Sequence, residues 1–163
     1  MMPKPVRPDL AFMRPKLSRW IALGFGSGLS PKAPGTCGTL FAWAAWLLLA
    51  QWMSPDQILL LCIPGFAIGV WACGQTGKAM GVADHGSIVW DEVIAFWLVL
   101  SLFPGGLLWQ LCAFGLFRFF DIVKPPPIRY FDARIKNGFG VMFDDLLAAG
   151  YAMLALLLWR ALA

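Results

Sequence analysis

The sequence contains few charged residues for its length. Asp, Glu, Lys and Arg make up 13% of the 163 residues, whereas a soluble domain usually carries about 25%. Hydrophobic residues make up 60%, the mean hydropathy is +0.70, and nine Trp favour the interface between lipid and water. This composition excludes an ordinary soluble domain. It predicts a single all-α, membrane-embedded domain over residues 1–163, a polytopic bundle of about four to five apolar helices.

Histidine and paired cysteines are also scarce. His85 is the single histidine, so a catalytic triad or a phosphohistidine scheme has little support, and we expect His85 to serve as a polar loop residue. The four cysteines show no CxxC spacing, and Cys62 and Cys112 lie in apolar runs, where cysteine acts as a small hydrophobe. We therefore expect neither a disulfide nor a thiolate metal site. A basic stripe with interleaved aromatics is absent too, which excludes nucleic acid as a partner.

Five apolar segments are expected to form the main helices: residues 40–53, 58–73, 88–103, 107–120 and 146–163. Several are shorter than the ~20 residues of a perpendicular span, so polar ends or local bilayer thinning must complete them. Turns at Ser54-Pro55-Asp56 and at Pro104-Gly105-Gly106 separate neighbouring segments.

The placement of charge predicts the orientation in the membrane. The first 20 residues form a basic amino-terminal segment with Lys4, Arg7, Arg14, Lys16 and Arg19. This segment indicates a cytoplasmic amino terminus attracted to anionic lipid, and the Gly, Pro and Ser that follow do not resemble a signal peptide. One kinked span over residues 88–120 would place the basic residues of 124–136 outside, against the positive-inside rule. A hairpin turning at residues 104–106 keeps the charged segments together on the cytoplasmic side.

Acidic residues are concentrated in one part of the chain. Seven of the nine carboxylates lie in residues 84–145: Asp84, Asp91, Glu92, Asp121, Asp132, Asp144 and Asp145. In the hairpin, Asp91 and Glu92 begin one helix and Asp121 ends its antiparallel partner, so at about 1.5 Å per residue they reach a similar depth. We expect Asp144 and Asp145 just before the last helix, and Asp84 in a loop. A carboxylate layer at one membrane face predicts a divalent-cation site.

Helix capping is the alternative explanation for these acids. Adjacent residues on a helix are about 100° apart, so two neighbouring acids are not expected to reach one ion together. Capping explains one acid per helix, but it does not explain two pairs and Asp121 at one level. We therefore favour a metal role, with six candidate ligands: Asp84, Asp91, Glu92, Asp121, Asp144 and Asp145. All of these except Asp84 are also candidate catalytic residues.

Two segments are candidates for binding phosphate. The Gly-rich residues 24–39 open the first long helix, where free amides, the helix dipole, Lys32 and Thr36 could hold an anion. Their spacing differs from GxxxxGK[ST], so a nucleotide P-loop is not supported. An equally weighted alternative is a loop in which Thr36 or Thr39 caps the helix.

The second candidate segment ends the fourth apolar segment and contains Arg118, Lys124 and Arg129. Arginine suits bidentate binding of phosphate. The alternative is that Arg118 or Lys124 satisfies helix carbonyls or extends toward lipid headgroups.

Four sequence blocks occur in one order: GSGLSPKAPGT at residues 26–36, DHGSIVWDE at 84–92, FRFFDIVKP at 117–125 and GFGVMFDDLLAAG at 138–150. With them the chain resembles the bacterial phosphatidylglycerophosphatase A family, lipid phosphatases of the inner membrane. The resemblance implies Mg²⁺-dependent removal of the terminal phosphate from phosphatidylglycerophosphate, giving phosphatidylglycerol, by a multi-pass protein whose site faces the cytoplasm. Ala95 stands where the family usually has Gly, and Pro126 where it has Trp; neither difference removes an ionisable group.

On this hypothesis Asp91, Glu92, Asp121 and Asp144 or Asp145 hold Mg²⁺, while Lys32, Arg118 and Lys124 neutralise the phosphate. A carboxylate or the metal activates water; an aspartyl-phosphate is the alternative, although the DxDxT signature is absent. A transporter would place ionisable groups near the bilayer midplane, and a scaffold would need no stacked acids. A CDP-alcohol phosphotransferase is disfavoured because DGxxAR does not occur.

Overall fold

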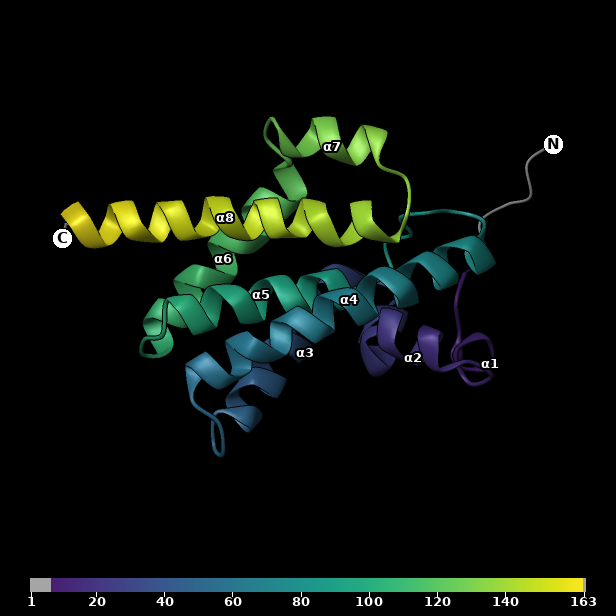
Figure 1. Ribbon diagram of the computed structural model, residues 1–163, viewed down its shortest axis with the longest axis horizontal. Helices are drawn as coiled ribbons and strands as arrows, with labels where there is room; N and C mark the ends of the chain where they lie inside the picture. The colour runs from purple at the N-terminus through teal and green to yellow at the C-terminus, as the bar shows by residue number, and fades with distance from the viewer. Residues whose placement is uncertain (1–6, 163) are drawn as a thin grey trace.

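The computed structural model describes residues 7–162, which fold entirely into helices, turns and loops without a strand. Lys4 of the predicted basic segment lies outside this range. The elements are α1 (Leu10–Met13), α2 (Leu17–Ala22), the 3-10 helix η1 (Gly24–Leu29), α3 (Pro34–Leu49), α4 (Pro55–Met80), α5 (Trp90–Leu102), α6 (Leu107–Val123), α7 (Ile128–Arg134) and α8 (Gly138–Leu162). In Figure 1, α4, α5 and α8 run along the long axis, with α7 outside α8 and α1 to α3 on the opposite side. The predicted all-α class is confirmed.

Each of the five predicted apolar segments overlaps one long helix, but the bounds differ. The segment 40–53 runs past the end of α3, the segment 88–103 is longer than α5, and α3, α4, α6 and α8 extend beyond their predicted segments. The prediction that Asp144 and Asp145 precede the last helix is wrong, because α8 already begins at Gly138. Buried Val141 and Met142 continue its apolar face on the amino-terminal side of the two acids. Likewise α3 begins at Pro34 and α4 continues to Met80. The short elements α1, α2, η1 and α7 were not predicted.

Helix α5 lies at the centre of the fold. It packs against α3, α4 and α8, and most of its apolar residues are buried against these neighbours. Val93, Phe96, Val99 and Leu100 are all fully buried. A helix that is apolar all round requires such an enclosed position, and this fixes the amino-terminal end of α5 as the inner wall of the charged region.

Helices α5 and α6 are joined by the predicted turn. Helix α5 ends at Leu102 and α6 begins at Leu107, on either side of Pro104-Gly105-Gly106. The ring of Phe96 stacks on that of Phe117, with centroids 5.7 Å apart. The early part of α5 therefore lies beside the late part of α6, as the hairpin prediction requires.

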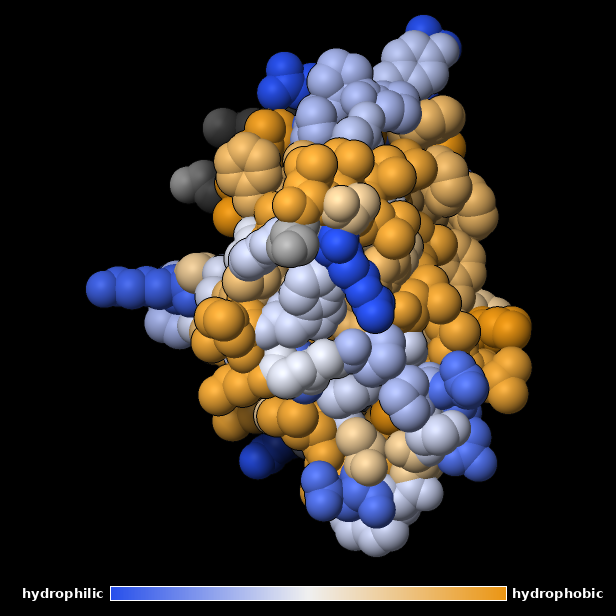
Figure 2. Space-filling view, turned by 90° about the vertical axis from the view of Figure 1, so that its left-hand side faces the viewer, coloured by the Kyte–Doolittle hydropathy of each residue, from blue (hydrophilic) through white to orange (hydrophobic). Residues whose placement is uncertain are grey.

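Helices α4 and α8 carry apolar residues on their outer surfaces. Leu60 and Ile63 of α4 and Leu158 of α8 are 64–70% exposed. On the face at the carboxyl-terminal end of α8, large apolar patches lie between residues of intermediate hydropathy and a few hydrophilic side chains (Figure 2). Within residues 7–162 these two helices are long and apolar enough to cross a bilayer, and α3 is a shorter apolar helix. An apolar exterior of this extent favours contact with lipid over contact with water.

Helices α4 and α8 cross closely where α8 begins. A Cβ built on Gly138 would lie 2.7 Å from the backbone nitrogen of Gly74 and would also collide with the carbonyl of Val70. Only glycine permits this approach. The crossing places the start of α8 beside the second half of α4, and α8 then runs back along it: Met142 lies against Gly69, and Leu146 lines one groove with Phe66. Asp144 and Asp145 lie between these two contacts.

Candidate active site

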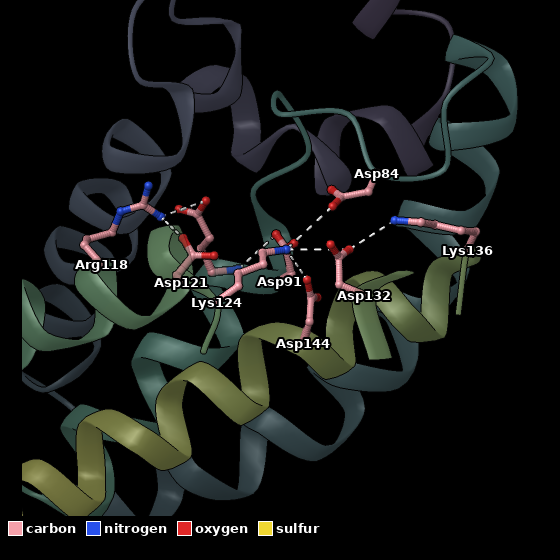
Figure 3. A network of polar contacts seen from close by, with 9 residues as sticks. Asp84, Asp91, Arg118, Asp121, Lys124, Asp132, Lys136 and Asp144 are labelled. Carbon is pink, nitrogen blue, oxygen red and sulfur yellow. Dashed lines mark hydrogen bonds and ion pairs between the residues drawn. The ribbon is translucent and has the colours of Figure 1, made fainter. Parts of the chain in front are cut away.

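Acidic and basic side chains from five parts of the chain meet in one layer (Figure 3). Asp91 and Glu92 come from the first turn of α5, and Asp121 comes from the last turn of α6. Asp84 lies in the loop before α5, Asp132 on α7, and Asp144 and Asp145 on α8. The predicted common level of the acids is therefore observed, because the hairpin turn places the start of α5 beside the end of α6.

The first acidic cluster contains Glu92, Asp121 and Asp145. One carboxylate oxygen from each lies within 4.8 Å of the others. Arg118 joins two of them: its Nη1 lies 3.0 Å from Glu92 Oε1 and also pairs with Asp121. Three helices thus contribute acids to one point, and a guanidinium group bridges α5 and α6.

Thr39 of α3 also belongs to this cluster. Its Oγ1 lies 2.8 Å from Glu92 Oε2 and 3.0 Å from the carbonyl oxygen of Gly35, and the residue is completely buried. The alternative prediction that Thr36 or Thr39 caps the helix is wrong, because the N-cap position is Ala33 and makes no side-chain bond. Sequence reasoning missed the contact with Glu92 because it joins residues distant in the chain.

The second acidic cluster contains Asp84, Asp132 and Asp144, again with oxygens within 4.8 Å of one another. Lys124 lies among them: its Nζ is 3.9 Å from Asp84 Oδ2 and 3.7 Å from Asp132 Oδ1, and it pairs with Asp144. Lys136 Nζ lies 3.2 Å from the same Asp132 oxygen. Asp132 and Lys136 were absent from the predicted site. Asp132 lies on α7, and Lys136 lies in the segment between α7 and α8.

The pKa values of Asp84 and Lys124 in this cluster differ from their ordinary values. Burial raises the pKa of Asp84 above its ordinary value, and the opposing charge of Lys124 only partly offsets this. Burial alone would lower the pKa of Lys124, but its hydrogen bond to Asp144 and the surrounding carboxylates raise it. Lys124 therefore remains protonated throughout the physiological pH range, as a phosphate-binding cation must.

Asp91 is buried but lies outside both clusters of three. Its Oδ1 accepts a hydrogen bond of 3.0 Å from the backbone amide of Glu92. One of its oxygens thus satisfies a free amide in the first turn of α5, which is the local role that acids commonly have at helix starts. Capping does not explain Asp144 and Asp145, because α8 begins several residues earlier.

The predicted phosphate-binding residues divide into two groups. Arg118 and Lys124 pair with carboxylates of the layer rather than with helix carbonyls. Lys32 is exposed in the loop before α3, and Thr36 lies in the first turn of that helix. Arg129 is exposed on α7 and forms no ion pair within residues 7–162, so the structure does not bring it into the layer.

His85 occupies the loop position expected from its isolation in the sequence. Its Nδ1 accepts a hydrogen bond of 3.1 Å from the amide of Ser87. This contact stabilises the turn that leads into α5.

The donor set of the layer fits a hard divalent cation. Seven carboxylates face three basic side chains, Arg118, Lys124 and Lys136, so negative charge is in excess. Two buried oxygens, Asp144 Oδ1 and Asp145 Oδ2, have no hydrogen-bond partner. Buried unpaired carboxylate oxygens are costly unless a cation or a proton satisfies them. Mg²⁺ prefers such oxygen ligands, and both clusters have the residues to hold it.

The structure thus combines an all-helical fold, two helices long and apolar enough to cross a bilayer, and one layer of paired acidic and basic side chains. The chain belongs to the phosphatidylglycerophosphatase A family, whose model matches residues 20–160. It is accordingly an enzyme of the phosphatase class.

Curated relatives agree over most of the chain. A phosphatidylglycerophosphatase A of Haemophilus influenzae is 49% identical over 136 residues, covering 82% of this chain and 83% of the relative. The phosphatidylglycerophosphatase A of Escherichia coli is 45% identical over 150 residues, covering 88% and 86%. A putative phosphatidylinositol-3-phosphatase of Bacteroides thetaiotaomicron is 37% identical over 148 residues, covering 86% and 91%. No solved structure matches the chain.

Proposed function

We propose that this enzyme hydrolyses phosphatidylglycerophosphate to phosphatidylglycerol and inorganic phosphate, with Mg²⁺ as cofactor. Membership of the phosphatidylglycerophosphatase A family over residues 20–160 is the observation that carries the proposal. The two acidic clusters, each with a basic side chain beside it, support it with a suitable site for an anionic substrate.

The metal would be held by two sets of side chains. Glu92, Asp121 and Asp145 form one candidate ligand set, and Asp84, Asp132 and Asp144 form the other. Mg²⁺ would supply positive charge that offsets the carboxylates and stabilises the charge developing on the phosphate oxygens.

The chain's own residues would bind the phosphate and move the proton. Arg118 and Lys124 are fixed by carboxylates in positions from which they can contact phosphate oxygens. Water attacks the phosphorus and gives one proton to a carboxylate; the bond between the phosphorus and the glycerol oxygen breaks, and the carboxylate passes that proton to the departing glycerol oxygen. Asp144 and Asp145 are the candidates for this carboxylate, because each has a buried oxygen without a hydrogen-bond partner.

The location proposed for this chemistry is the cytoplasmic face of the bacterial inner membrane. Helices α4 and α8 would span the bilayer. The shorter apolar helices α3, α5 and α6 would complete the multi-pass bundle, because the bilayer thins locally around them or polar residues at their ends extend the span. The basic residues at the start of the chain and around Lys124 favour this orientation by the positive-inside rule. A site at this depth suits a lipid whose acyl chains remain in the bilayer.

Transport and scaffolding are less consistent with the layer. A transporter holds its ionisable groups near the midplane of the membrane, whereas these acids lie at the start of α5, at the end of α6, in the early part of α8 and in the adjoining segments. A scaffold requires no converging carboxylates.

The test is phosphate release from phosphatidylglycerophosphate in detergent micelles by purified protein, first with Mg²⁺ and then with excess EDTA. We expect rapid release that EDTA stops. Asp121→Asn and Asp145→Asn each remove a candidate metal ligand and should each abolish turnover while the protein remains folded. Absence of release by well-folded wild-type protein with Mg²⁺ present would reject the proposal.

A further inference from the structure

A groove of about 610 Å³ lies between the end of α4 and the start of α8. Its lining combines the basic residues Lys78 and Lys136, the amide side chain of Asn137, and the apolar side chains of Trp71 and Phe139. None of these residues belongs to the phosphate-binding or metal-binding sets assigned above. The combination of two cations with aromatic surface is suited to an anionic group attached to an apolar body.

The groove adjoins the second acidic cluster directly. Lys136 Nζ lies 3.2 Å from Asp132 Oδ1, and Lys124 Nζ lies 3.7 Å from that same oxygen. One carboxylate oxygen therefore separates a cation of the groove from a cation of the proposed phosphate site. Lys78 pairs with no acid within residues 7–162 and leaves its charge available to a ligand.

The loop that joins the groove to the cluster is held against α4. A Cβ on Gly77 would lie 2.7 Å from the carbonyl oxygen of Ala83, the residue before Asp84. Since the loop rests this closely on the helix, the groove and the carboxylate of Asp84 are fixed relative to each other.

The lipid named in the proposed function carries two phosphates. The terminal phosphomonoester is removed, and a phosphodiester one glycerol unit away remains in the product. If the monoester lies at Lys124, a second anion only a few bonds away reaches the region of Lys136. The diester also connects to the acylated glycerol, whose acyl chains require an apolar surface. In the groove, Trp71 is 50% exposed and Phe139 is 43% exposed and can supply that surface.

We propose that this groove binds the non-reacting phosphodiester of the lipid substrate through Lys78 and Lys136 and so sets the preference for lipids with two phosphates. This inference rests on the proposed function. Phosphatidic acid, which has a terminal phosphomonoester but no diester, should make no use of the groove. In this proposal the groove determines which lipid phosphate is preferred, and the acid layer catalyses hydrolysis of the phosphomonoester.

The experiment compares kcat/KM for phosphatidylglycerophosphate and for phosphatidic acid in the same micelles with Mg²⁺. Lys78→Gln should lower the value for phosphatidylglycerophosphate about tenfold, the effect of one lost charge-assisted hydrogen bond. Its value for phosphatidic acid should not change. Lys136→Gln should lower the ratio of the two values, and Lys136→Arg should restore it. Arg160→Gln, at the far end of α8, is the matched loss of charge and should change neither value.

Phosphatidylglycerol gives a second measurement, because it retains the diester and lacks the monoester. Its inhibition constant should rise about tenfold in Lys78→Gln. Equal losses on both substrates, or an unchanged ratio and an unchanged inhibition constant, would overturn the groove assignment. Failure of the wild-type enzyme to release phosphate from phosphatidylglycerophosphate would instead reject the proposed function, so the two failures are distinguishable.

Discussion

Arg118 of α6 lies 3.0 Å from Glu92 of α5, and the same guanidinium nitrogen also pairs with Asp121. All three side chains are 10–13% exposed, so the contacts are only weakly screened by water. One arginine thus holds the start of α5 and the end of α6 at a common level. It also places a fixed positive charge beside the first acidic cluster.

Replacing Arg118 with Lys should therefore be a severe change. A lysine carries one compact charge and cannot bridge two carboxylates and a phosphate with the geometry of a guanidinium group. We expect kcat/KM for the lipid substrate to fall at least about tenfold in Arg118→Lys and further in Arg118→Gln. Arg129→Lys on α7 is the control, since Arg129 lies outside the layer. Wild-type activity in Arg118→Lys would show that Arg118 does not contact the substrate.

Thr39 should position the carboxylate of Glu92 through the 2.8 Å contact between their oxygens. Thr39→Val keeps the shape of the side chain and removes this contact, leaving a buried oxygen of Glu92 without its partner. We expect a loss of about 1–3 kcal/mol in stability, with a lower thermal midpoint and reduced kcat. Thr39→Ser keeps the hydroxyl and should recover most of both. A Val variant equal to wild type would exclude the positioning role.

Magnesium should stabilise the folded protein, because a ligand that binds only the native state raises the free energy of unfolding. At a concentration about 100 times the dissociation constant, the gain is about 2.7 kcal/mol. We expect a higher thermal midpoint for the wild type in Mg²⁺ than in EDTA, and a smaller difference for Asp145→Asn. Asp56→Asn is the control, because Asp56 lies in the first turn of α4, outside the acid layer. An identical response of wild type and Asp145→Asn would remove Asp145 from the ligand set.

Gly138→Ala should disrupt the crossing of α4 and α8. The added methyl would meet the carbonyl of Val70 and the backbone of Gly74, and overpacking of this kind costs about 1–3 kcal/mol. Gly150→Ala in the same helix meets no atom within 4 Å and should instead be neutral or slightly stabilising. The measurement is the thermal midpoint of unfolding of Gly138→Ala and of Gly150→Ala, each compared with the wild type. Equal midpoints would contradict the close crossing.

The candidate site was predictable from the sequence where charge interrupts apolar runs. Asp91, Glu92 and Asp121 could be placed at one level because the proline and glycines at 104–106 require a reversal between two helices of similar length. The first residue of α8 could not be predicted from the pattern of apolar and charged residues. Its acids are buried within the helix, so the apolar pattern ended too early, and the burial that permits them comes only from neighbouring helices.

The contacts that join distant segments were not predictable. The contact of Thr39 with Glu92 depends on how α3 packs against α5, and the position of Asp132 depends on how α7 folds back over α8. Arg129 shows the converse: it lies in the same basic segment as Lys124, yet the helical turn after the prolines carries it outward.

The sequence by itself determined the all-helical class, the apolar exterior and the inventory of acids and bases, because composition and local turn residues act without reference to distant contacts. Tertiary structure alone decided which acids share a cluster, which cation lies beside each, and that a groove with two further lysines opens next to them. Those relationships arise from helix crossings such as that of Gly138 on α4, where side chains far apart in the chain are brought within contact distance.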